Sequence, residues 1–305
     1  MYFAVNECPE AQLLTSLLEA ITAHPQPKTR WYALMDQAFD HDQRPPIRWH
    51  RAVGAIYRMS GAEQISPLLL ELPPALGEEL ADDLMRLIRH AQSRPMLSFV
   101  QTTLSLDALC EAWQSIKWVE TSDGQRLLFR FADARGITAL PTCLSADHWA
   151  RVCDPLVAWH VASRTGALQA LPMPGPEQRS ASQATLAEQN HPFRITDAEL
   201  DRLMDASLPD ALIDALHERV PDALLMCERK ADAYEWVRGS CALAKASQMD
   251  SSEDQLALAA AVCLSGGTLL RHPELPSLLA AHKGDSAALT DALVDLLPNH
   301  EEAFE

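Results

Sequence analysis

A stretch rich in proline, glutamine, serine and alanine, residues 172–192, divides the chain into two parts with different sequence patterns. Before it, short apolar runs of strand length alternate with longer segments of helical periodicity, whereas only helical patterns follow it. Such a stretch is typical of a linker. We therefore predict an α+β fold for residues 1–171, with a small mixed sheet flanked by helices, and an all-α helical lobe for residues 193–305.

The first part contains a strong hairpin signal among its expected elements. Asp123-Gly124 lies between two strand-like runs, residues 117–120 and 126–132. Asp-Gly in that position favours a tight turn that joins the two strands in a β-hairpin. Strands separated by helices, together with one hairpin, predict a mixed sheet. The other expected strands are 31–35, 53–57, 67–72 and 97–102, and the expected helices are 11–23, 76–88 and 106–116.

The helical part begins with a specific signal for a helix start. Thr196 and Glu199 form a capping box, and Ile195 and Leu200 have the spacing of a hydrophobic staple. Pro209 is expected to begin a second helix, since proline is favoured in the first helical turn. Further helices are expected over 223–246, 253–264 and 285–297.

Charge narrows the possible partners. The chain has 25 Lys and Arg against 42 Asp and Glu, a net charge of −17, of which −4 falls in residues 1–171 and −13 in residues 172–305. Such a field repels phosphate backbones and anionic membranes, so neither nucleic acid nor a membrane is an expected partner, while a basic protein is allowed.

Three further observations bear on location. Apolar runs fall well short of the roughly 20 residues that a membrane-spanning helix needs. The first residues carry no Lys or Arg before a long apolar run, so no secretory signal is expected. Seven cysteines without a CxxC pair are typical of buried thiols in a reducing compartment. We expect a cytoplasmic location.

Motifs for common enzyme chemistry are absent from the sequence: it contains no Walker loop, GxGxxG, HExxH, GxSxG or EF-hand pattern, and we expect no cofactor. One acidic cluster could hold a divalent cation through its oxygen atoms, as in a metal-dependent hydrolase. It lacks the layout of a calcium loop, and we interpret it as a polar loop after a strand. Its members are Asp36, Asp40, His41 and Asp42.

The segment from Phe129 to Arg135 has two interpretations. Strand alternation would place Phe129 and Phe131 on one face and Arg130 on the other. Arg130 could then clamp the backbone or a carboxylate of a partner protein. Alternatively, it forms an internal ion pair at the strand end, with Asp36 as a candidate acceptor, and we favour this structural interpretation.

Three segments in order resemble the family called domain of unknown function 4123, over about residues 30–156. They are Trp31-Tyr32-Ala33-Leu34-Met35-Asp36, then Ser66-Pro67-Leu68-Leu69-Leu70, then the hairpin, whose second strand continues as Leu127-Leu128-Phe129-Arg130-Phe131-Ala132-Asp133-Ala134-Arg135. Ala134 stands where the family usually has proline, and Ala132 where an aromatic residue is common. The signature residues, which are also the candidate partner-binding residues, are Trp31, Tyr32, Asp36, Phe129, Arg130, Asp133 and Arg135.

The resemblance implies a non-enzymatic adaptor, or effector chaperone, of a bacterial type VI secretion system. Such a protein holds one cognate effector in the cytoplasm and helps to load it onto the VgrG/PAAR spike, which is a further possible partner. An adaptor of this kind needs an exposed apolar groove with a polar rim, which we expect between the two lobes. Two alternatives remain: an immunity protein that neutralises a toxin, and the metal-dependent hydrolase.

Overall fold

The computed structural model describes residues 2–23, 28–40, 46–175 and 193–297. Residue contacts divide the chain into two compact units. The α/β unit is Glu7–Ala206, and the helical unit combines Met1–Asn6 with Ser207–Glu305. The prediction of an α+β N-terminal part followed by a helical region is confirmed.

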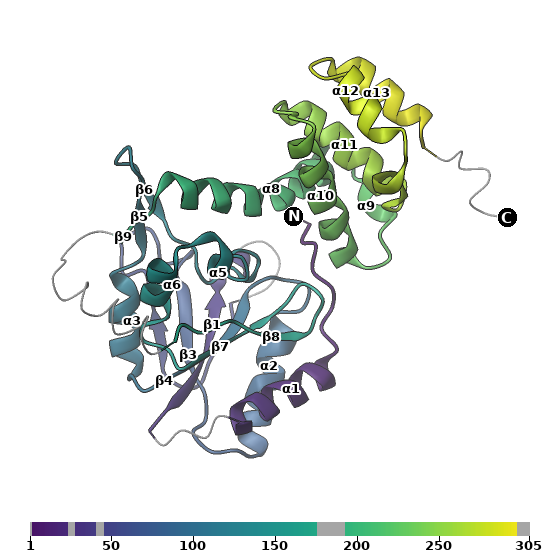
Figure 1. Cartoon of the computed structure of the whole chain (residues 1–305). Helices are drawn as coiled ribbons and strands as arrows, with labels where there is room; N and C mark the ends of the chain where they lie inside the picture. The colour runs from purple at the N-terminus through teal and green to yellow at the C-terminus, as the bar shows by residue number, and fades with distance from the viewer. Residues whose placement is uncertain (1, 24–27, 41–45, 176–192, 298–305) are drawn as a thin grey trace. The chain divides into compact units, whose positions relative to one another are not determined.

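A six-stranded sheet forms the centre of the α/β unit (Figure 1). Its strands are β1 (Arg30–Asp36), β2 (Val53–Ala55), β3 (Pro67–Glu71), β4 (Leu97–Thr102), β7 (Ala158–Ala162) and β8 (Leu168–Ala170). They lie in the order β2-β3-β1-β4-β7-β8, and every neighbouring pair is antiparallel. Because β4 is covered on both faces, all six of its residues are buried and the usual alternation is lost.

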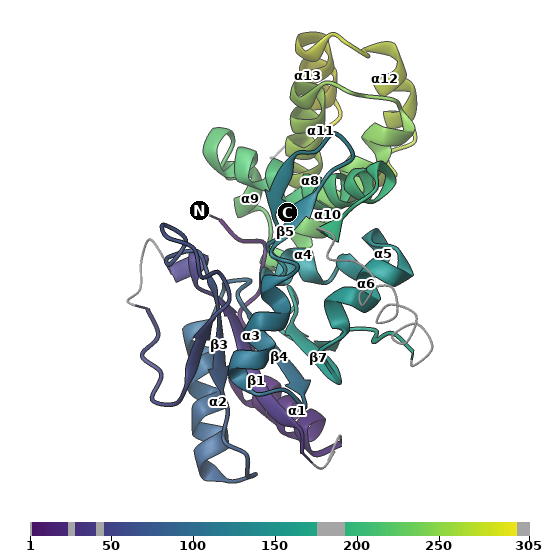
Figure 2. The same cartoon turned by 90° about the vertical axis from the view of Figure 1, so that its left-hand side faces the viewer.

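Two sets of helices cover the two faces of this sheet. The helices α1 (Glu10–Ala23) and α2 (Glu78–His90) pack Leu17 and Leu84 against Met35 and Phe99 of one face. On the other face lie α3 (Leu106–Gln114), which is in front of the sheet in Figure 2, and α6 (Ala146–Cys153). The short helices α4 (Ala134–Ile137) and α5 (Leu140–Cys143) join the hairpin to α6.

The predicted hairpin is present in a second, three-stranded sheet. Strands β5 (Trp118–Glu120) and β6 (Arg126–Leu128) pair antiparallel, and Gly124 between them has a φ of 82°, which glycine adopts without strain. β6 ends at Leu128, earlier than the predicted 132. The third strand, β9 (Phe193–Arg194), pairs parallel with β5, so the parallel pairing occurs in this small sheet.

The unit boundaries differ from the predicted domain boundaries. Pairing of β9 with β5 brings residues 193–194 into the α/β unit, whereas the prediction began the helical lobe at residue 193. The boundary falls between Ala206 and Ser207, inside helix α8 (Asp197–Arg219). Most of the predicted linker, residues 176–192, lies outside the described residues. The first difference arises from long-range strand pairing, and the second from packing of Leu200 and Leu203 of α8 against the α/β core; composition reveals neither.

The helical unit stacks helices around two adjoining apolar clusters. One contains Leu216, Val237 and Ala259, and the other contains Leu258, Leu279 and Leu289. Figures 1 and 2 both show α12 and α13 side by side. After α8, its elements are α9 (Asp222–Leu225), α10 (Lys230–Ala246), α11 (Ser252–Leu264), the 3-10 helix η2 (Thr268–Arg271), α12 (Leu275–Ala281) and α13 (Ser286–Asp295).

Two helix predictions in this part are wrong. Pro209 does not begin a helix but lies inside α8, where burial of Leu212 and Leu216 in the next two turns compensates for the loss of one backbone hydrogen bond. The predicted helix 223–246 is two helices, α9 and α10. The Asn6 side chain accepts a hydrogen bond from the backbone N–H of Ala231 at 2.9 Å, so a residue from the other end of the chain caps α10.

The seven cysteines are all free thiols, and four of them are buried, in agreement with the expected absence of a disulfide framework. The described helices include none with the length and hydropathy of a transmembrane span.

Candidate functional site

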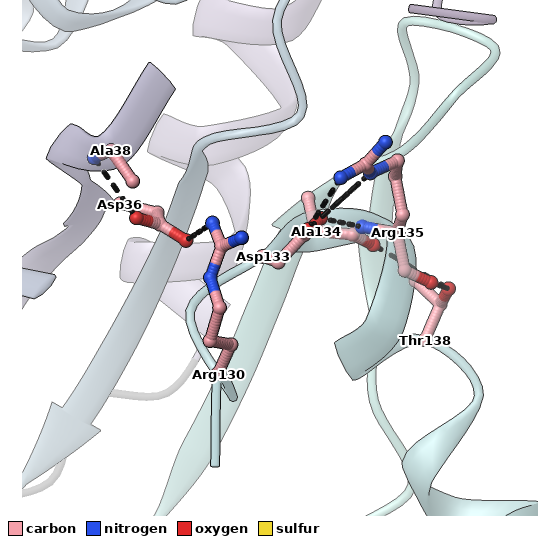
Figure 3. Close-up of polar contacts among 7 residues, drawn as sticks. All are labelled: Asp36, Ala38, Arg130, Asp133, Ala134, Arg135 and Thr138. Atoms are coloured by element: carbon pink, nitrogen blue, oxygen red, sulfur yellow. Dashed lines mark hydrogen bonds and ion pairs between the residues drawn. The ribbon is translucent and has the colours of Figure 1, made fainter. Parts of the chain in front are cut away.

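The site begins with Asp36, the last residue of β1, which is only 1% exposed. Its Oδ2 lies 2.7 Å from Nη2 of Arg130, and its Oδ1 accepts the backbone N–H of Ala38 at 3.1 Å (Figure 3). The internal ion pair expected for Arg130 is therefore present. It joins two segments that lie 94 residues apart in the sequence.

Burial alternates along the segment that carries Arg130. Phe129 and Phe131 are buried in the core, whereas the Arg130 side chain is 43% exposed. This pattern was predicted from strand alternation, although the segment lies beyond the end of β6. Tyr57 holds it in place, because its hydroxyl donates a hydrogen bond to the carbonyl oxygen of Phe129 at 2.8 Å.

Asp133 and Arg135 form a second pair immediately after it. The Asp133 side chain caps α4 by accepting the backbone N–H of Arg135 at 2.9 Å, and its Oδ2 also lies 2.9 Å from Arg135 Nη2 (Figure 3). Ala134, which stands where the family usually has proline, is the first residue of α4. Its N–H donates to the carbonyl oxygen of Pro95 at 2.9 Å, a bond that proline could not make.

Phe39 connects the two arginines, and the sequence provided no signal for this role. The guanidinium carbons of Arg130 and Arg135 lie 5.4 Å and 5.3 Å from the centre of its ring, within the range of cation–π contacts. Phe39 belongs to the 3-10 helix η1 (Gln37–Asp40), which directly follows β1. Both arginines are therefore oriented by one aromatic ring as well as by a carboxylate.

The other end of η1 is anchored by Asp40. Its Oδ1 lies 2.9 Å from Nε2 of His90, and it also forms an ion pair with Arg94, which donates a further hydrogen bond to the carbonyl oxygen of Phe39 at 3.1 Å. His90 and Arg94, like Phe39, were not among the predicted site residues. We call the connected residues Asp36, Phe39, Asp40, His90, Arg94, Arg130, Asp133 and Arg135 the charged cluster.

These contacts bear on the predicted acidic cluster. Asp36 and Asp40 each have a cationic partner, and they face different partners. His41 and Asp42 lie outside the described residues. Within the part of the chain that the structure describes, no three His, Cys, Asp or Glu side chains are grouped closely enough to hold a metal ion.

The two carboxyl groups have opposite electrostatic environments. Burial raises the pKa of Asp36 above its ordinary value, and Arg130 only partly opposes this. Burial acts in the same direction on Asp40, but His90 and Arg94 outweigh it and lower its pKa. The arrangement neutralises buried charges and holds η1 against the sheet, while the exposed side of Arg130 can contact another molecule.

Trp31 and Tyr32 are not brought to this cluster. They lie at the opposite end of β1 from Asp36, about 15 Å away at the rise of a strand. Tyr32 is fully buried, and its hydroxyl donates to the carbonyl oxygen of Leu104 at 3.2 Å. Trp31 is half-buried with its ring 5.7 Å from that of His160. Both residues therefore contribute to the core of the α/β unit.

A further buried contact extends the predicted capping box. The backbone N–H of Glu199 donates to Thr196 Oγ1 at 3.2 Å, and the Thr196 N–H donates back to Glu199 Oε2 at 2.8 Å. Glu199 Oε1 also accepts the backbone N–H of Ser145 at 2.6 Å and lies 2.7 Å from His148 Nδ1. Burial would raise the pKa of Glu199, but these hydrogen bonds dominate and lower it to about 2.

The Glu7–Ala206 unit is therefore an α+β domain with helices on both faces of an antiparallel sheet. Arg130, which follows the hairpin, forms an internal ion pair with Asp36 at the end of β1. Residues 31–151 match the model of a family described as a domain of unknown function, DUF4123, and this part of the chain belongs to that family. The match lies within the expected range of 30–156, and the helical unit is outside it. Comparisons with curated proteins and with solved structures give no match.

Proposed function

We propose that this protein is a non-catalytic adaptor of a bacterial type VI secretion system. It binds one cognate effector in the cytoplasm and promotes its loading onto the VgrG/PAAR spike. The observation that carries the proposal is the family match over residues 31–151, which includes the hairpin and its Arg130–Asp36 ion pair. The type VI adaptor role is the known context of this family.

The charged cluster supports a binding role over a catalytic one. A hydrolase would use Asp36 and Asp40 as metal ligands or bases, but cationic side chains hold both carboxylates. Carboxylates paired in this way hold η1 in position after β1. In the proposed adaptor these ion pairs mainly maintain the shape of the α/β unit. Contact between the exposed side of Arg130 and the client is a secondary role.

The charge of the chain supports a protein partner with a basic surface. A net charge of −17 repels nucleic acid and attracts cationic protein surfaces, which raises the rate of association more than the final affinity. That the client contacts both units stays a prediction.

Co-purification tests the proposal. The full chain, tagged and produced in the native bacterium, is expected to retain one secreted effector, and deletion of its gene is expected to abolish secretion of that effector only. Secretion of a second effector in the same strain is the control for an intact apparatus. Recovery of no effector would contradict the proposal.

Mapping the bound region separates an adaptor from an immunity protein. An adaptor protects the delivery region of the effector from proteolysis and leaves its toxic domain active. Binding to the toxic domain, with loss of toxicity, would instead identify an immunity protein.

A further inference from the structure

The helical unit has an apolar groove of about 370 Å³ on one face of α11. The C-terminal end of α8 and helix α13 form its two sides. Of its lining residues, Leu256 and Leu293 are almost fully buried, whereas Ala257 and Ala260 are half-buried. Small side chains at the centre allow the backbone of another helix to approach closely. The groove lies entirely within the helical unit, outside the family match.

The rim of the groove combines an exposed apolar residue with charged residues. Val294 is 58% exposed and lies next to the buried Leu293, so the apolar lining of the groove continues to the protein surface. On the α8 side, Arg219 and Glu253 form an ion pair with two hydrogen bonds of 2.8 and 3.0 Å. The one basic residue among the described residues that line the groove is therefore already paired. Asp291 and Asp295 are exposed on α13 beside Val294.

The surrounding charge selects a cationic occupant. Over the described residues 207–297, the helical unit has 7 Lys and Arg against 14 Asp and Glu, a net charge of −7. A partner segment with lysine or arginine on either side of an apolar face would meet charges of the opposite sign. An acidic segment would be repelled.

The dimensions of the groove fit a short helix. The groove-lining part of α11 runs from Glu253 to Leu264, about 17 Å at the rise of an α-helix, or about three turns. A volume of about 370 Å³ accommodates a few apolar side chains inserted from a short helix, while the helix backbone stays above the groove. An amphipathic helix docks into such a groove through apolar residues spaced three and four apart.

We propose that this groove binds an amphipathic helix of the client protein, with an aliphatic face and basic flanks. This inference rests on the proposed adaptor function, because it assigns the helix to the effector. It adds a docking surface in the helical unit, which the family match over residues 31–151 does not cover.

A labelled peptide tests the groove directly. The probe is a 14-residue synthetic peptide with leucines at helical spacing and lysines elsewhere, and its binding to the full chain is measured by fluorescence anisotropy. Val294→Asp places a carboxylate at the apolar rim and is expected to weaken binding about tenfold or more, equivalent to about 1.4 kcal/mol. Equal binding by the wild-type chain and by Val294→Asp would overturn the proposal.

Leu225→Asp is the matched control. Leu225 is 78% exposed in α9, does not line the groove and gains the same charge, so the net charge of the unit changes equally in both variants. Its affinity is expected to stay close to that of the wild-type chain. Circular dichroism checks that both variants are folded. A peptide with glutamates in place of the lysines is expected to bind far more weakly, and equal affinity would refute the basic flanks.

Two other occupants are outcomes of the same experiments. A dimer of the wild-type chain that Val294→Asp converts to a monomer, measured by sedimentation, would assign the groove to a second copy and overturn the proposal. Much tighter peptide binding by a chain ending at Leu297 would assign it to the chain's own last residues.

Co-purification with these variants separates the two proposals. Loss of the effector from Val294→Asp but not from Leu225→Asp supports the groove. Equal retention by both variants overturns the groove and leaves the adaptor function standing, whereas absence of any effector from the wild-type chain contradicts the adaptor function itself.

Discussion

The α/β unit and the helical unit are stabilised by different kinds of polar contact. In the α/β unit, buried carboxylates pair with residues far away in the sequence: Asp36 with Arg130, and Glu199 with His148. In the helical unit, ion pairs lie at the surface: Arg238 with Glu235 and Arg219 with Glu253, with all four side chains more than half exposed. Its interior consists mostly of leucine, alanine and valine.

This difference indicates which changes each unit tolerates. In the α/β unit, single polar side chains hold loops in position, because an unpaired buried charge is strongly unfavourable. In the helical unit, apolar stripes determine how helices pack, so its exposed charged side chains should tolerate substitution. Four substitutions test the comparison.

The largest effect is expected from Trp113→Ala in the α/β core. Trp113 is 1% exposed, its ring lies 5.1 Å from that of Phe131 and 5.6 Å from that of Trp159, and the substitution leaves a large cavity. We expect a loss of about 3–5 kcal/mol in the free energy of unfolding, measured by urea denaturation. Trp118→Ala, at a half-buried position in the small sheet, is the control with a smaller loss. Equal losses would show that the aromatic core is not central to this unit.

Glu199→Gln is expected to have the next largest effect. With a pKa of about 2 in the folded state and 4.5 as its ordinary value, Glu199 contributes stability that is complete above about pH 4.5 and is lost as the pH falls toward 2. This difference in pKa between the folded and unfolded states corresponds to about 3 kcal/mol in the free energy of unfolding at neutral pH. The glutamine variant should be less stable at neutral pH and should lose less stability on acidification, as followed by urea denaturation across pH 2–7.

The exposed Glu253 provides the matched control for this pH profile. Glu253→Gln removes a carboxylate from the surface pair with Arg219 in the helical unit and is expected to leave the stability nearly unchanged at neutral pH. A pH profile of Glu199→Gln that coincides with that of the wild-type chain would refute the role of this carboxylate.

Arg130→Ala tests whether the charged cluster is structural. It leaves the Asp36 carboxylate buried without its cation, and because Arg130 is itself partly exposed we expect a loss of about 2 kcal/mol. Asp36→Asn removes the buried charge instead and should have a smaller effect. The loss in Arg130→Ala should shrink as the pH falls and Asp36, whose pKa burial already raises, takes up a proton. A fully stable Arg130→Ala chain that no longer binds its effector would make Arg130 a partner-binding residue.

The smallest effect is expected from Arg238→Gln in the helical unit. Exposed pairs three residues apart on a helix contribute at most about 0.5 kcal/mol. Urea denaturation should give nearly the same free energy of unfolding for this variant and the wild-type chain. Added salt should remove the small difference that is left between them. A loss as large as that of Arg130→Ala would remove the contrast between the units.

Local signals in the sequence located many elements correctly. The Asp123-Gly124 turn, the Thr196–Glu199 capping box and the leucine stripe of α2 were all identified, because each depends on residues within one or two turns of one another. Prediction of a helix start at Pro209 failed because apolar residues on its two sides pack against different clusters, Leu203 against the α/β core and Leu212 against the helical unit, while α8 stays continuous.

Part of the site was also predictable. Asp36 and Arg130 were named together as a possible ion pair, and the pair is present. Phe39, His90 and Arg94 carry no local pattern that points to the site. Their roles depend on α2 and η1 being folded against the sheet, which brings together residues 50 or more positions apart.

By itself, the sequence determined the fold class of the two parts, the strongly acidic net charge and the family of residues 31–151. Only the tertiary structure decided that residues 193–206 join the α/β unit, that Asn6 caps α10, and that an apolar groove opens beside α11. Turns, caps and apolar stripes act over a few residues and are written into neighbouring positions. Strand pairing, buried ion pairs and grooves exist only once distant segments are packed together.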